Sequence, residues 1–232
     1  MSNLAIITAR GGSKRIPRKN IKDFCGKPII YYSIKAAVES GIFSEVMVST
    51  DDQEIADYAL QCGAKVPFMR SAVTANDYAT TAEVLIEVLA EYKMRGREFD
   101  IACCIYPTAP FITAEKLKIS YKKLLEKQAD SILPVVRFSF PPQRAFVIEN
   151  RKLCYKWPEN RNTRSQDLEP FFHDSGQFYM FCVSRFLETK SLIMENTIHH
   201  EVSELEVQDI DNIEDWKLAE IKYQILKSKE NI

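Results

Sequence analysis

Short apolar runs alternate with amphipathic segments along the first two thirds of the chain. The runs show no clear polar alternation, which is typical of strands buried on both faces of a sheet. These runs predict strands over residues 4–8, 45–49, 100–106 and 131–136. Segments with apolar residues three to four positions apart predict helices over residues 28–40, 51–62, 80–92 and 113–127. This alternation favours an α/β fold with a mainly parallel sheet and helices on both faces.

Polar residues at the predicted helix ends agree with the hydrophobic pattern. Thr80 and Glu83 have the spacing of a capping box. Asp51 and Asp52 begin the second helix, where the helix dipole favours acidic residues. Gly41 follows the first helix and can end it.

The pattern changes after residue 136. Residues 137–172 are rich in proline, arginine, asparagine and aromatic residues, and they include a predicted hairpin that turns near Asn150. A strand over residues 177–182 then returns to the α/β pattern. The intervening residues are therefore expected to leave the main fold and return to it.

The last part of the chain is predicted to contain one more strand and one more helix. The strand is expected around residues 204–207, and the amphipathic helix ends near Lys227. No repeat or low-complexity linker divides the sequence. We expect a single domain over residues 1–232, with an excursion at about 137–176.

The composition is that of a globular protein. Of the 232 residues, 46% are hydrophobic and 27% are charged, which is unlike a disordered chain. The net charge of −1 excludes a global basic field of the kind that drives nucleic-acid binding. Any strongly basic segment is therefore a local feature.

The cysteines and the N-terminal segment bear on the compartment. None of the six cysteines forms a C-x-x-C pair, so a zinc site is not expected and the thiols are interpreted as reduced. The sequence has no recognisable signal peptide, and no apolar run approaches the roughly 20 residues of a membrane span. We expect a cytoplasmic protein.

A basic loop follows the first predicted strand directly, within AIITARGGSKRIPRKN (5–20). Gly11 and Gly12 permit close backbone approach, and their N–H groups, with the Ser13 hydroxyl, can bind phosphate oxygens. The positive charge comes from Arg10, Lys14, Arg15, Arg18 and Lys19. The loop matches neither the P-loop nor the G-x-G-x-x-G pattern, so it indicates a phosphate site of another kind. The alternative is a solvated basic turn or a contact surface for RNA.

An acidic segment, QDIDNIEDW, precedes the last helix. Asp209 and Asp211 flank Ile210 at the end of a predicted strand, and residues two apart on a strand point the same way. Both carboxylates can then bind one divalent cation such as Mg²⁺, together with substrate phosphates. The alternative is a helix start in which Asp209 or Asn212 is the capping residue. A phosphate-binding loop in the same chain favours the metal site.

Five stretches together resemble one enzyme family along essentially the whole chain. They are ARGGSKRIPRKN, GKP, STDDQEIA, YPTAP and VQDID. They are similar to motifs of the cytidylyltransferases that make CMP-activated nonulosonic acids such as sialic acid. The resemblance implies a Rossmann-like α/β sandwich and a homodimer, in which an excursion helps to close the active site of the partner.

Within this family, three stretches are most similar to members that act on pseudaminic acid. They are FPPQRA, WPENRNTRSQDLE and FHDSGQFY. Members that act on sialic acid usually have glutamine where Tyr106 stands, and an Arg-Pro-Asn-Gly-like stretch at residues 173–176. The alternatives are sialic acid, legionaminic acid or an eight-carbon keto acid as the sugar, and a catalytically silent nucleotide-binding regulator.

The resemblance implies attack of the anomeric hydroxyl of the sugar on the α-phosphorus of CTP, with release of pyrophosphate. Lys19 would bind the α-phosphate and stabilise the charge that develops there. Asp209 and Asp211 would hold Mg²⁺, and Asp211 or a metal-bound hydroxide would accept the proton. The implied catalytic residues are therefore Lys19, Arg10 and Asp211.

The implied nucleotide site extends from the phosphates to the base. The β- and γ-phosphates would contact Arg10, Ser13 and Arg15. Asn20 and Arg70 are candidates for the base pocket. Thr80 or Thr81 would lie near the nucleoside, although Thr80 is equally well explained as a helix cap. The full set is Arg10, Gly11, Gly12, Ser13, Arg15, Lys19, Asn20, Arg70, Thr80 and Thr81.

The candidates for the sugar site include cations, because the sugar carries a carboxylate. Arg144 and Arg164 are suited to bidentate carboxylate contact and could reach across the dimer; the alternative for each is a surface salt bridge. His173 beside Asp174 could bind sugar hydroxyls or amides, or could be a structural pair. His199 and His200 are expected in a loop without a metal constellation. The full set is Tyr106, Arg144, Arg164, His173, Asp174 and Gln177.

Overall fold

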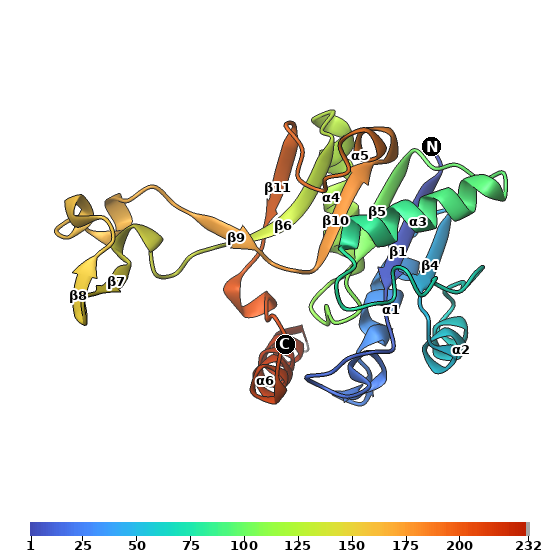
Figure 1. The fold of residues 1–232 in the computed structure, drawn as a ribbon, viewed down its shortest axis with the longest axis horizontal. Coiled ribbons are helices and arrows are strands. Elements are labelled where there is room, and N and C mark those ends of the chain that lie inside the picture. The colour runs from blue at the N-terminus through green and yellow to red at the C-terminus, as the bar shows by residue number, and fades with distance from the viewer. Residues whose placement is uncertain (231–232) are drawn as a thin grey trace.

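The computed structural model describes residues 1–230, which form an α/β body and a projecting arm (Figure 1). A seven-stranded sheet runs through the body in the order β11-β6-β10-β5-β1-β4, and β9 continues alongside β6. β10 is antiparallel to its neighbours β5 and β6, and the other pairs along this order are parallel. The strands are β1 Asn3–Thr8, β4 Glu45–Ser49, β5 Ile101–Ile105, β6 Ser131–Arg137, β9 Phe172–Asp174, β10 Phe178–Cys182 and β11 Thr197–Glu201. The predicted α/β fold with a mainly parallel sheet is confirmed.

Helices cover both faces of the sheet (Figure 1). Apolar residues of α1, α2 and α4 pack against one face, and those of α3 and α5 pack against the other. The sixth helix, α6, packs instead on the segment that follows β1. The helices are α1 Ile30–Ser40, α2 Gln53–Gln61, α3 Thr81–Met94, α4 Ala114–Glu126, α5 Val183–Thr189 and α6 Ile213–Glu230.

The first strand shows why its sequence lacks polar alternation. Ala5 and Ile7 belong to the core under α1 and α4, and Leu4 and Ile6 belong to the core under α3. All four side chains are fully buried. A strand in the middle of a helix-covered sheet has no solvent face, so both sets of positions are apolar.

Short 3-10 turns and two small hairpins complete the described elements. One hairpin pairs β2 with β3 before α1, so α1 begins at Ile30 and the expected start at residue 28 is wrong. Pro28 lies in β3, where its lack of an N–H is tolerated at a strand end. These elements are β2 Asp23–Phe24, β3 Lys27–Pro28, β7 Phe146–Glu149, β8 Lys152–Tyr155, η1 Lys19–Ile21, η2 Pro142–Arg144, η3 Pro158–Asn160, η4 Ser165–Asp167 and η5 Glu204–Glu206.

The strand expected around residues 204–207 is wrong. Ser203 and Glu206 form a capping box there and turn the chain into η5. The edge strand lies earlier, in β11, which contains His199 and His200, so their expected loop placement is also wrong. His200 is buried, and its Nδ1 lies 2.9 Å from the Ser120 hydroxyl. Four of the five residues of β11 are polar, which conceals the strand from a hydrophobic pattern.

The arm, residues 138–171, leaves the sheet after β6 and returns at β9 (Figure 1). It contains the β7–β8 hairpin, whose predicted turn is confirmed at Asn150 and Arg151, with φ of 51° and 64°. Asparagine tolerates the left-handed region better than most residues, which explains the signal in the sequence. The change in composition after residue 136 therefore coincides with the chain leaving the body.

No helix among the described residues is long and apolar enough to cross a bilayer.

Glu45 anchors the amino end of the sheet, opposite the carboxyl ends of the parallel strands. Its side chain is 1% exposed and accepts hydrogen bonds from Tyr92, Arg97 and Lys65. Burial alone would raise the pKa of Glu45, but these three donors outweigh it and hold the pKa below its usual value. The ionised carboxylate therefore stabilises the fold above the ordinary pKa of glutamate, and this contribution is lost as the pH falls through the lowered pKa.

We predict that Glu45→Gln lowers the free energy of unfolding by about 1–3 kcal/mol at pH 7, because buried donors lose a charged acceptor. The penalty should begin to shrink as the pH falls below the ordinary pKa of glutamate, about 4.3, and should be lost as the pH falls through the lowered pKa of folded Glu45. Urea unfolding of the wild type and of Glu45→Gln, from pH 7 down to the acid range, measures this difference in the free energy of unfolding. Glu126→Gln, which removes one partner of an exposed Lys122–Glu126 pair at 3.7 Å, is the matched control and should change stability little. A Glu45→Gln penalty that is independent of pH would contradict the assignment.

Candidate active site

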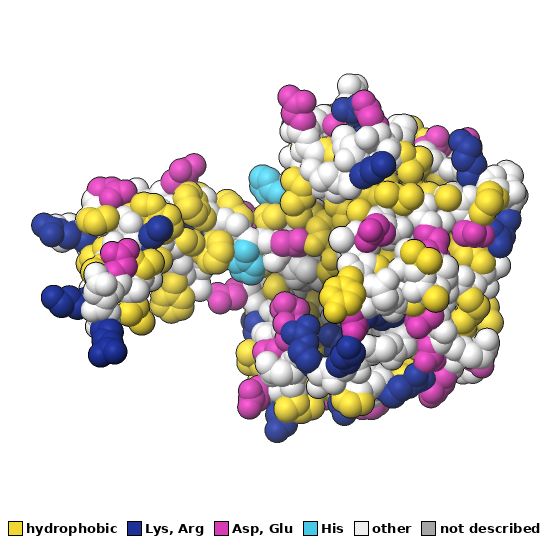
Figure 2. Space-filling view, in the orientation of Figure 1, with side chains coloured by type: hydrophobic (Ala, Val, Ile, Leu, Met, Phe, Trp, Pro, Cys, Tyr) yellow, Lys and Arg dark blue, Asp and Glu magenta, His cyan; other side chains and the backbone are white. Residues whose placement is uncertain are grey.

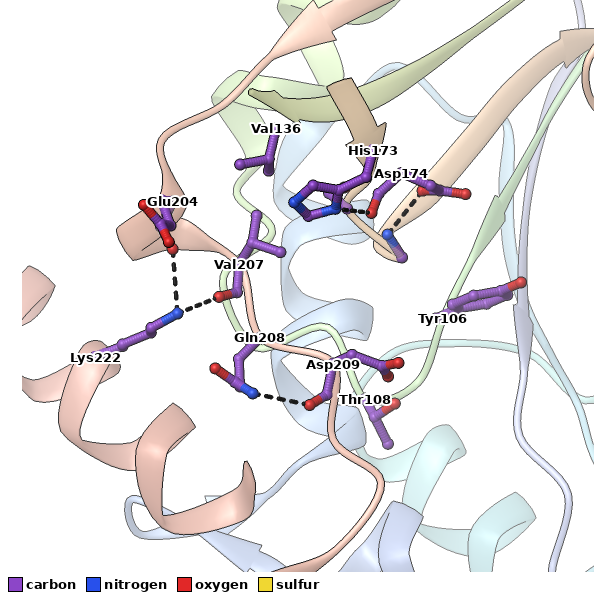
Figure 3. Close-up of a pocket in the computed structure, with 12 residues that line it drawn as sticks. Tyr106, Thr108, Val136, His173, Asp174, Glu204, Val207, Gln208, Asp209 and Lys222 are labelled. Atoms are coloured by element: carbon purple, nitrogen blue, oxygen red, sulfur yellow. Dashed lines mark hydrogen bonds between the residues drawn. The ribbon is translucent and has the colours of Figure 1, made fainter. Parts of the chain in front are cut away.

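Three adjoining cavities lie at the carboxyl ends of β1 and β5. The loop cavity, about 370 Å³, is lined by the basic loop. It shares Thr108 with the arm-side cavity, about 500 Å³, which lies below β9 (Figure 3). It shares Thr8, Arg10 and Asp77 with the α3 cavity, about 190 Å³. Ligands of open α/β sheets bind at this edge of the strands.

The loop cavity collects most of the predicted phosphate-binding residues. It is formed where the chain leaves β1 and turns through η1. Its lining is strongly basic, with one carboxylate, Asp77. The lining residues are Thr8, Arg10, Ser13, Lys14, Arg15, Lys19, Asn20, Asp77, Pro107 and Thr108.

Two acidic residues before α2 hold the loop in position. The Gly11 N–H donates to the Asp51 carboxylate at 2.9 Å. Arg18, with a φ of 55°, pairs with Asp52 and Glu54. A Cβ on Gly11 would lie 2.7 Å from Oδ2 of Asp52, so only glycine fits there.

Gly12 differs from Gly11. A Cβ on Gly12 would meet nothing within 4 Å, and Gly12 is not among the glycines with positive φ. The structure therefore explains the glycine at position 11 by close packing, and it imposes no such requirement at position 12.

The basic loop and the acidic segment meet although they are 191 residues apart. The Lys19 ammonium donates to the Ile210 carbonyl at 2.7 Å, and the Arg15 guanidinium lies 2.7 Å from the Asp211 carboxylate. Burial lowers the pKa of Lys19, whereas the charges of Asp211 and Asp209 oppose that shift. Cations and carboxylates thus form one charged site.

The N-terminal cap of α6 does not use the carboxylates of Asp209 and Asp211. Asn212 accepts hydrogen bonds from the N–H groups of Glu214 and Asp215 at 2.8 and 3.0 Å. Asp215 accepts from the N–H groups of Asp211 and Asn212. Asn212 is therefore the capping residue, and the carboxylates of Asp209 and Asp211 are not needed for the helix start.

Asp209 and Asp211 lie in an irregular segment. The prediction that they stand at the end of a strand is therefore wrong. Within residues 1–230, no group of three or more histidine, cysteine, aspartate or glutamate side chains is arranged to hold a metal ion. The exposed Asp209 carboxylate has no hydrogen bond or ion pair among the described residues. The Asp209 carboxylate, together with that of Asp211, which pairs with Arg15, suits a cation that takes its other ligands from water and substrate phosphates.

The α3 cavity contains two of the predicted nucleoside residues, Arg70 and Thr81. Arg70 is 7% exposed and donates to the hydroxyl and the carbonyl of Ser49 at 3.0 and 2.7 Å. Burial lowers its pKa. Asn20 lies in the loop cavity, where its amide donates to the Arg10 carbonyl at 2.8 Å.

Thr80 caps α3. Its hydroxyl accepts from the Glu83 N–H at 3.2 Å, and the Glu83 carboxylate accepts from the Thr80 N–H, which completes a capping box. Thr80 is not among the residues that line the α3 cavity. Its helix-cap interpretation is confirmed, and Thr81 is the threonine that faces that cavity.

The arm-side cavity contains three of the predicted sugar-binding residues, Tyr106, His173 and Asp174 (Figure 3). The pairing imagined between His173 and the Asp174 carboxylate is not formed. Nδ1 of His173 lies 2.9 Å from the Asp174 main-chain oxygen, and its ring packs on Phe138. The Asp174 carboxylate instead accepts from the Gly176 N–H at 2.8 Å and from the Tyr179 hydroxyl.

Other predicted sugar residues do not line this cavity. Gln177 is buried; its amide nitrogen donates to the Glu206 carbonyl at 2.7 Å, and its amide oxygen has no partner. Arg144 and Arg164 lie on the arm. Arg164 pairs with Asp167 at 2.7 Å, and neither arginine lines any of the three cavities of its own chain.

Sequence reasoning missed several lining residues. Asp77 pairs with Arg10 at 2.6 Å and with Lys14, so it balances the charge of the basic loop. Lys222 of α6 lines the arm-side cavity, and its ammonium donates to the carbonyls of Glu204 and Val207 at 3.2 and 2.7 Å (Figure 3). Burial lowers the pKa of Lys222. Neither residue belongs to a local motif, so no signal in the sequence distinguishes it from a surface charge.

A mixed α/β sheet with a glycine-containing basic loop after its first strand, facing two aspartates, defines a nucleotidyltransferase. The sequence matches the family described as Cytidylyltransferase over residues 4–225, and the chain belongs to that family.

Named relatives share nearly the full length of the chain. The chain is 41% identical over 226 residues to a pseudaminic acid cytidylyltransferase of Campylobacter jejuni, covering 97% of each chain. It is 34% identical to a CMP-N,N'-diacetyllegionaminic acid synthase of Legionella pneumophila, covering 95% of each. Among solved structures, a CMP:2-keto-3-deoxy-manno-octonic acid synthetase complexed with CTP matches with a TM-score of 0.67 at 20% identity, over 98% of this chain and 100% of that chain. This last likeness concerns the fold alone.

We predict that Gly11→Ala weakens CTP binding about tenfold or more, because the loop must move away from Asp52 and a misplacement of about 1 Å can cost up to about 10²-fold. Gly12→Ala is the matched variant, since its Cβ meets no protein atom within 4 Å, and it should weaken binding less. Calorimetric titration with CTP measures both affinities. Equal losses in the two variants would argue against the packing explanation.

Proposed function

We propose that the protein transfers CMP from CTP to pseudaminic acid, giving CMP-pseudaminic acid and diphosphate. The observation that carries this proposal is the contact of the basic loop with Ile210 and Asp211 at the boundary between the loop cavity and the arm-side cavity. Similarity to proteins named pseudaminic acid cytidylyltransferase supports the choice of sugar.

The loop cavity is the proposed triphosphate site. Arg10, Ser13 and Arg15 bind the β- and γ-phosphates beside the backbone of Gly11 and Gly12. Lys19 binds the α-phosphate, where negative charge grows during attack. Because Lys19 is half-buried and fixed by the Ile210 carbonyl, its ammonium is already oriented before the reaction.

The α3 cavity and the adjoining part of the loop cavity form the proposed nucleoside site. Arg70 and Asn20 are held by hydrogen bonds to the backbone, so their positions are fixed before a base enters. Thr81 faces this cavity, and Thr80 supports it as the cap of α3.

Asp209 and Asp211 are the proposed holders of a divalent cation, with Mg²⁺ as the metal. The unpartnered Asp209 carboxylate and the exposed face of Asp211 fit a site that is completed by phosphates and water. When bound, Mg²⁺ would supply charge neutralisation of the phosphates and a lower pKa for the attacking hydroxyl. Arg15 pairs with Asp211 in the free protein. When phosphates bind, Arg15 would contact them and release the Asp211 carboxylate for the cation.

The arm-side cavity is the proposed sugar site, next to the α-phosphate through the shared Thr108. Tyr106, His173 and Asp174 supply polar contacts, and Gln177 lies behind them with a free amide oxygen. The carboxylate of the sugar needs a cation. Arg144 and Arg164 of a partner arm are the proposed partners, and Lys222 is the ammonium that faces this cavity from the same chain.

The arm supports a homodimer. Several of its large apolar side chains are exposed, and Figure 2 shows them gathered on the projecting lobe. Exposed fractions reach 87% for Phe140, 78% for Ile148 and 67% for Leu153. A contiguous apolar surface of this kind marks an interaction site, and a second copy of the arm or body is the proposed partner.

A cytoplasmic location is part of the proposal. All six cysteines lie within the described residues and are free thiols. Cys103 and Cys104 are fully buried, and burial raises the pKa of both thiols. Reduced cysteines are typical of the cytosol.

We predict that pyrophosphate is released from CTP and Mg²⁺ with pseudaminic acid and not with N-acetylneuraminic acid. Lys19→Met should lower kcat about 10²–10³-fold with a smaller change in the KM for CTP, because Lys19 acts on charge that grows in the transition state. Lys27→Met, outside the three cavities, is the matched control. Release with N-acetylneuraminic acid instead would overturn the choice of sugar. CTP binding without release from any keto-acid sugar would favour the silent regulator.

The same assay tests the metal site. Asp211→Asn should raise the Mg²⁺ concentration needed for half-maximal rate, because one anionic ligand is removed.

We predict that Ile148→Asp shifts the protein from dimer to monomer, because a charge on the apolar face of the arm must be desolvated at an interface. Light scattering after size-exclusion chromatography gives the mass directly. Met94→Asp, at a 72% exposed apolar residue on the body, is the control and should remain dimeric. A wild-type protein that is monomeric at all concentrations would refute the dimer.

A further inference from the structure

One carboxylate lies among the cations of the loop cavity. Asp77 lines this cavity together with Arg10 and Lys14. Its Oδ1 accepts from Nη1 of Arg10 at 2.6 Å, and its Oδ2 pairs with the Lys14 ammonium. The two oxygens of Asp77 thus meet two cations of the basic loop, which is how two oxygens of a phosphate group would meet them.

The turn that carries Asp77 is held by contacts of its own. The side-chain oxygen of Asn76 accepts from the N–H groups of Tyr78 and Ala79 at 2.7 and 2.9 Å. These hydrogen bonds close the turn around Asp77 and do not involve the basic loop. The position of Asp77 beside the loop cavity therefore does not depend on its two ion pairs.

The two cations are not equally fixed. Nη1 of Arg10 also donates to the Asn76 carbonyl at 3.0 Å, so the charge of Asp77 is not needed to orient Arg10. The Lys14 side chain is 80% exposed and has a flexible stem, which lets its ammonium turn from one anion to another. Both cations can therefore exchange the Asp77 carboxylate for a phosphate.

Asp77 is an anion under the conditions in which phosphates bind. Hydrogen bonds from Lys14 and Arg10 hold the pKa of Asp77 below its usual value, so the group is ionised at neutral pH. A carboxylate and a phosphate take the same donors from arginine and lysine. A phosphate group that enters the loop cavity must draw Arg10 and Lys14 away from Asp77.

We propose that Asp77 is an internal competitor of the β- and γ-phosphates, which gives up Arg10 and Lys14 when CTP binds and takes them back as pyrophosphate leaves. The inference rests on the proposed triphosphate site. Four cations line the loop cavity, and they would otherwise retain a product with several negative charges. Asp77 acts through Arg10 and Lys14, so it is a positioning residue for the phosphates and for release of the product.

The test compares the affinities of CTP, pyrophosphate and CMP, measured by calorimetry with Mg²⁺ and without sugar, for the wild type and for Asp77→Asn. Asparagine keeps the size of the side chain and removes its charge. We expect Asp77→Asn to bind CTP and pyrophosphate about threefold to tenfold more tightly, which is the size expected for two partly exposed ion pairs. CMP lacks the β- and γ-phosphates and should bind equally well to both proteins.

Product inhibition gives a second readout. In Asp77→Asn, the inhibition constant of pyrophosphate against CTP should fall by the same factor as its dissociation constant. Asp77→Glu retains the charge and should stay closer to the wild type than Asp77→Asn in both measurements.

Glu54→Gln is the matched control. Glu54 pairs with Arg18 of the same basic loop, so this variant also removes one carboxylate charge from a loop cation. Neither Glu54 nor Arg18 lines the loop cavity. The variant should leave all three affinities within about twofold of the wild type.

The pattern across the three ligands distinguishes competition from the other roles of Asp77. Weaker binding of CTP and pyrophosphate in Asp77→Asn would mean that Asp77 orients the cations. Weaker binding of CTP and CMP would mean that it contacts the ribose from the α3 cavity, which it also lines. Tighter binding of all three ligands would mean that it acts only through its field.

Each of these three results, or affinities that do not change, would overturn the inference and leave the triphosphate site standing. A wild type that binds neither CTP nor pyrophosphate would overturn the proposed triphosphate site itself.

Discussion

The site depends on one contact between distant parts of the chain, in which Lys19 and Arg15 of the basic loop meet Ile210 and Asp211. Without the carboxylates, the loop would be a concentration of like charge with nothing to hold it in shape. Without the loop, the acidic segment would be no more than the approach to a helix. The contact gives the adjoining cavities a shared charged centre in which cations of the loop face carboxylates of the acidic segment.

The rest of the molecule positions this centre. Close packing of Gly11 on Asp52 fixes the loop against α2, and the caps at Asn212 and Thr80 fix the starts of α6 and α3 around it. The antiparallel strand β10 packs the Tyr179 ring edge to face against Tyr106, and the Tyr179 hydroxyl donates to Asp174 at the arm-side cavity. The arm carries its own apolar surface away from the body and adds nothing to the cavities of its own chain.

Local patterns explain which elements were predicted and which were not. The apolar centre of β1 at residues 4–7, the capping box at Thr80 and the turn at Asn150 are each encoded within a few residues, so the sequence predicts them directly. β11 could not, because His200 is buried with Ser120 as its partner and looks polar in isolation. The assignment of 204–207 as a strand failed because the Ser203 cap, a local hydrogen bond, outweighed the weak alternation.

The sequence by itself determined the fold class, the basic loop after the first strand and the acidic segment before the last helix, because residue type and short spacing decide these. Only the tertiary structure decided which polar groups meet. It joined Lys19 to Ile210 across 191 residues, left Arg144 and Arg164 on the arm, and placed Lys222 at a cavity. Strand order and helix packing set the distances between these groups. They cannot be predicted from the segments taken one at a time.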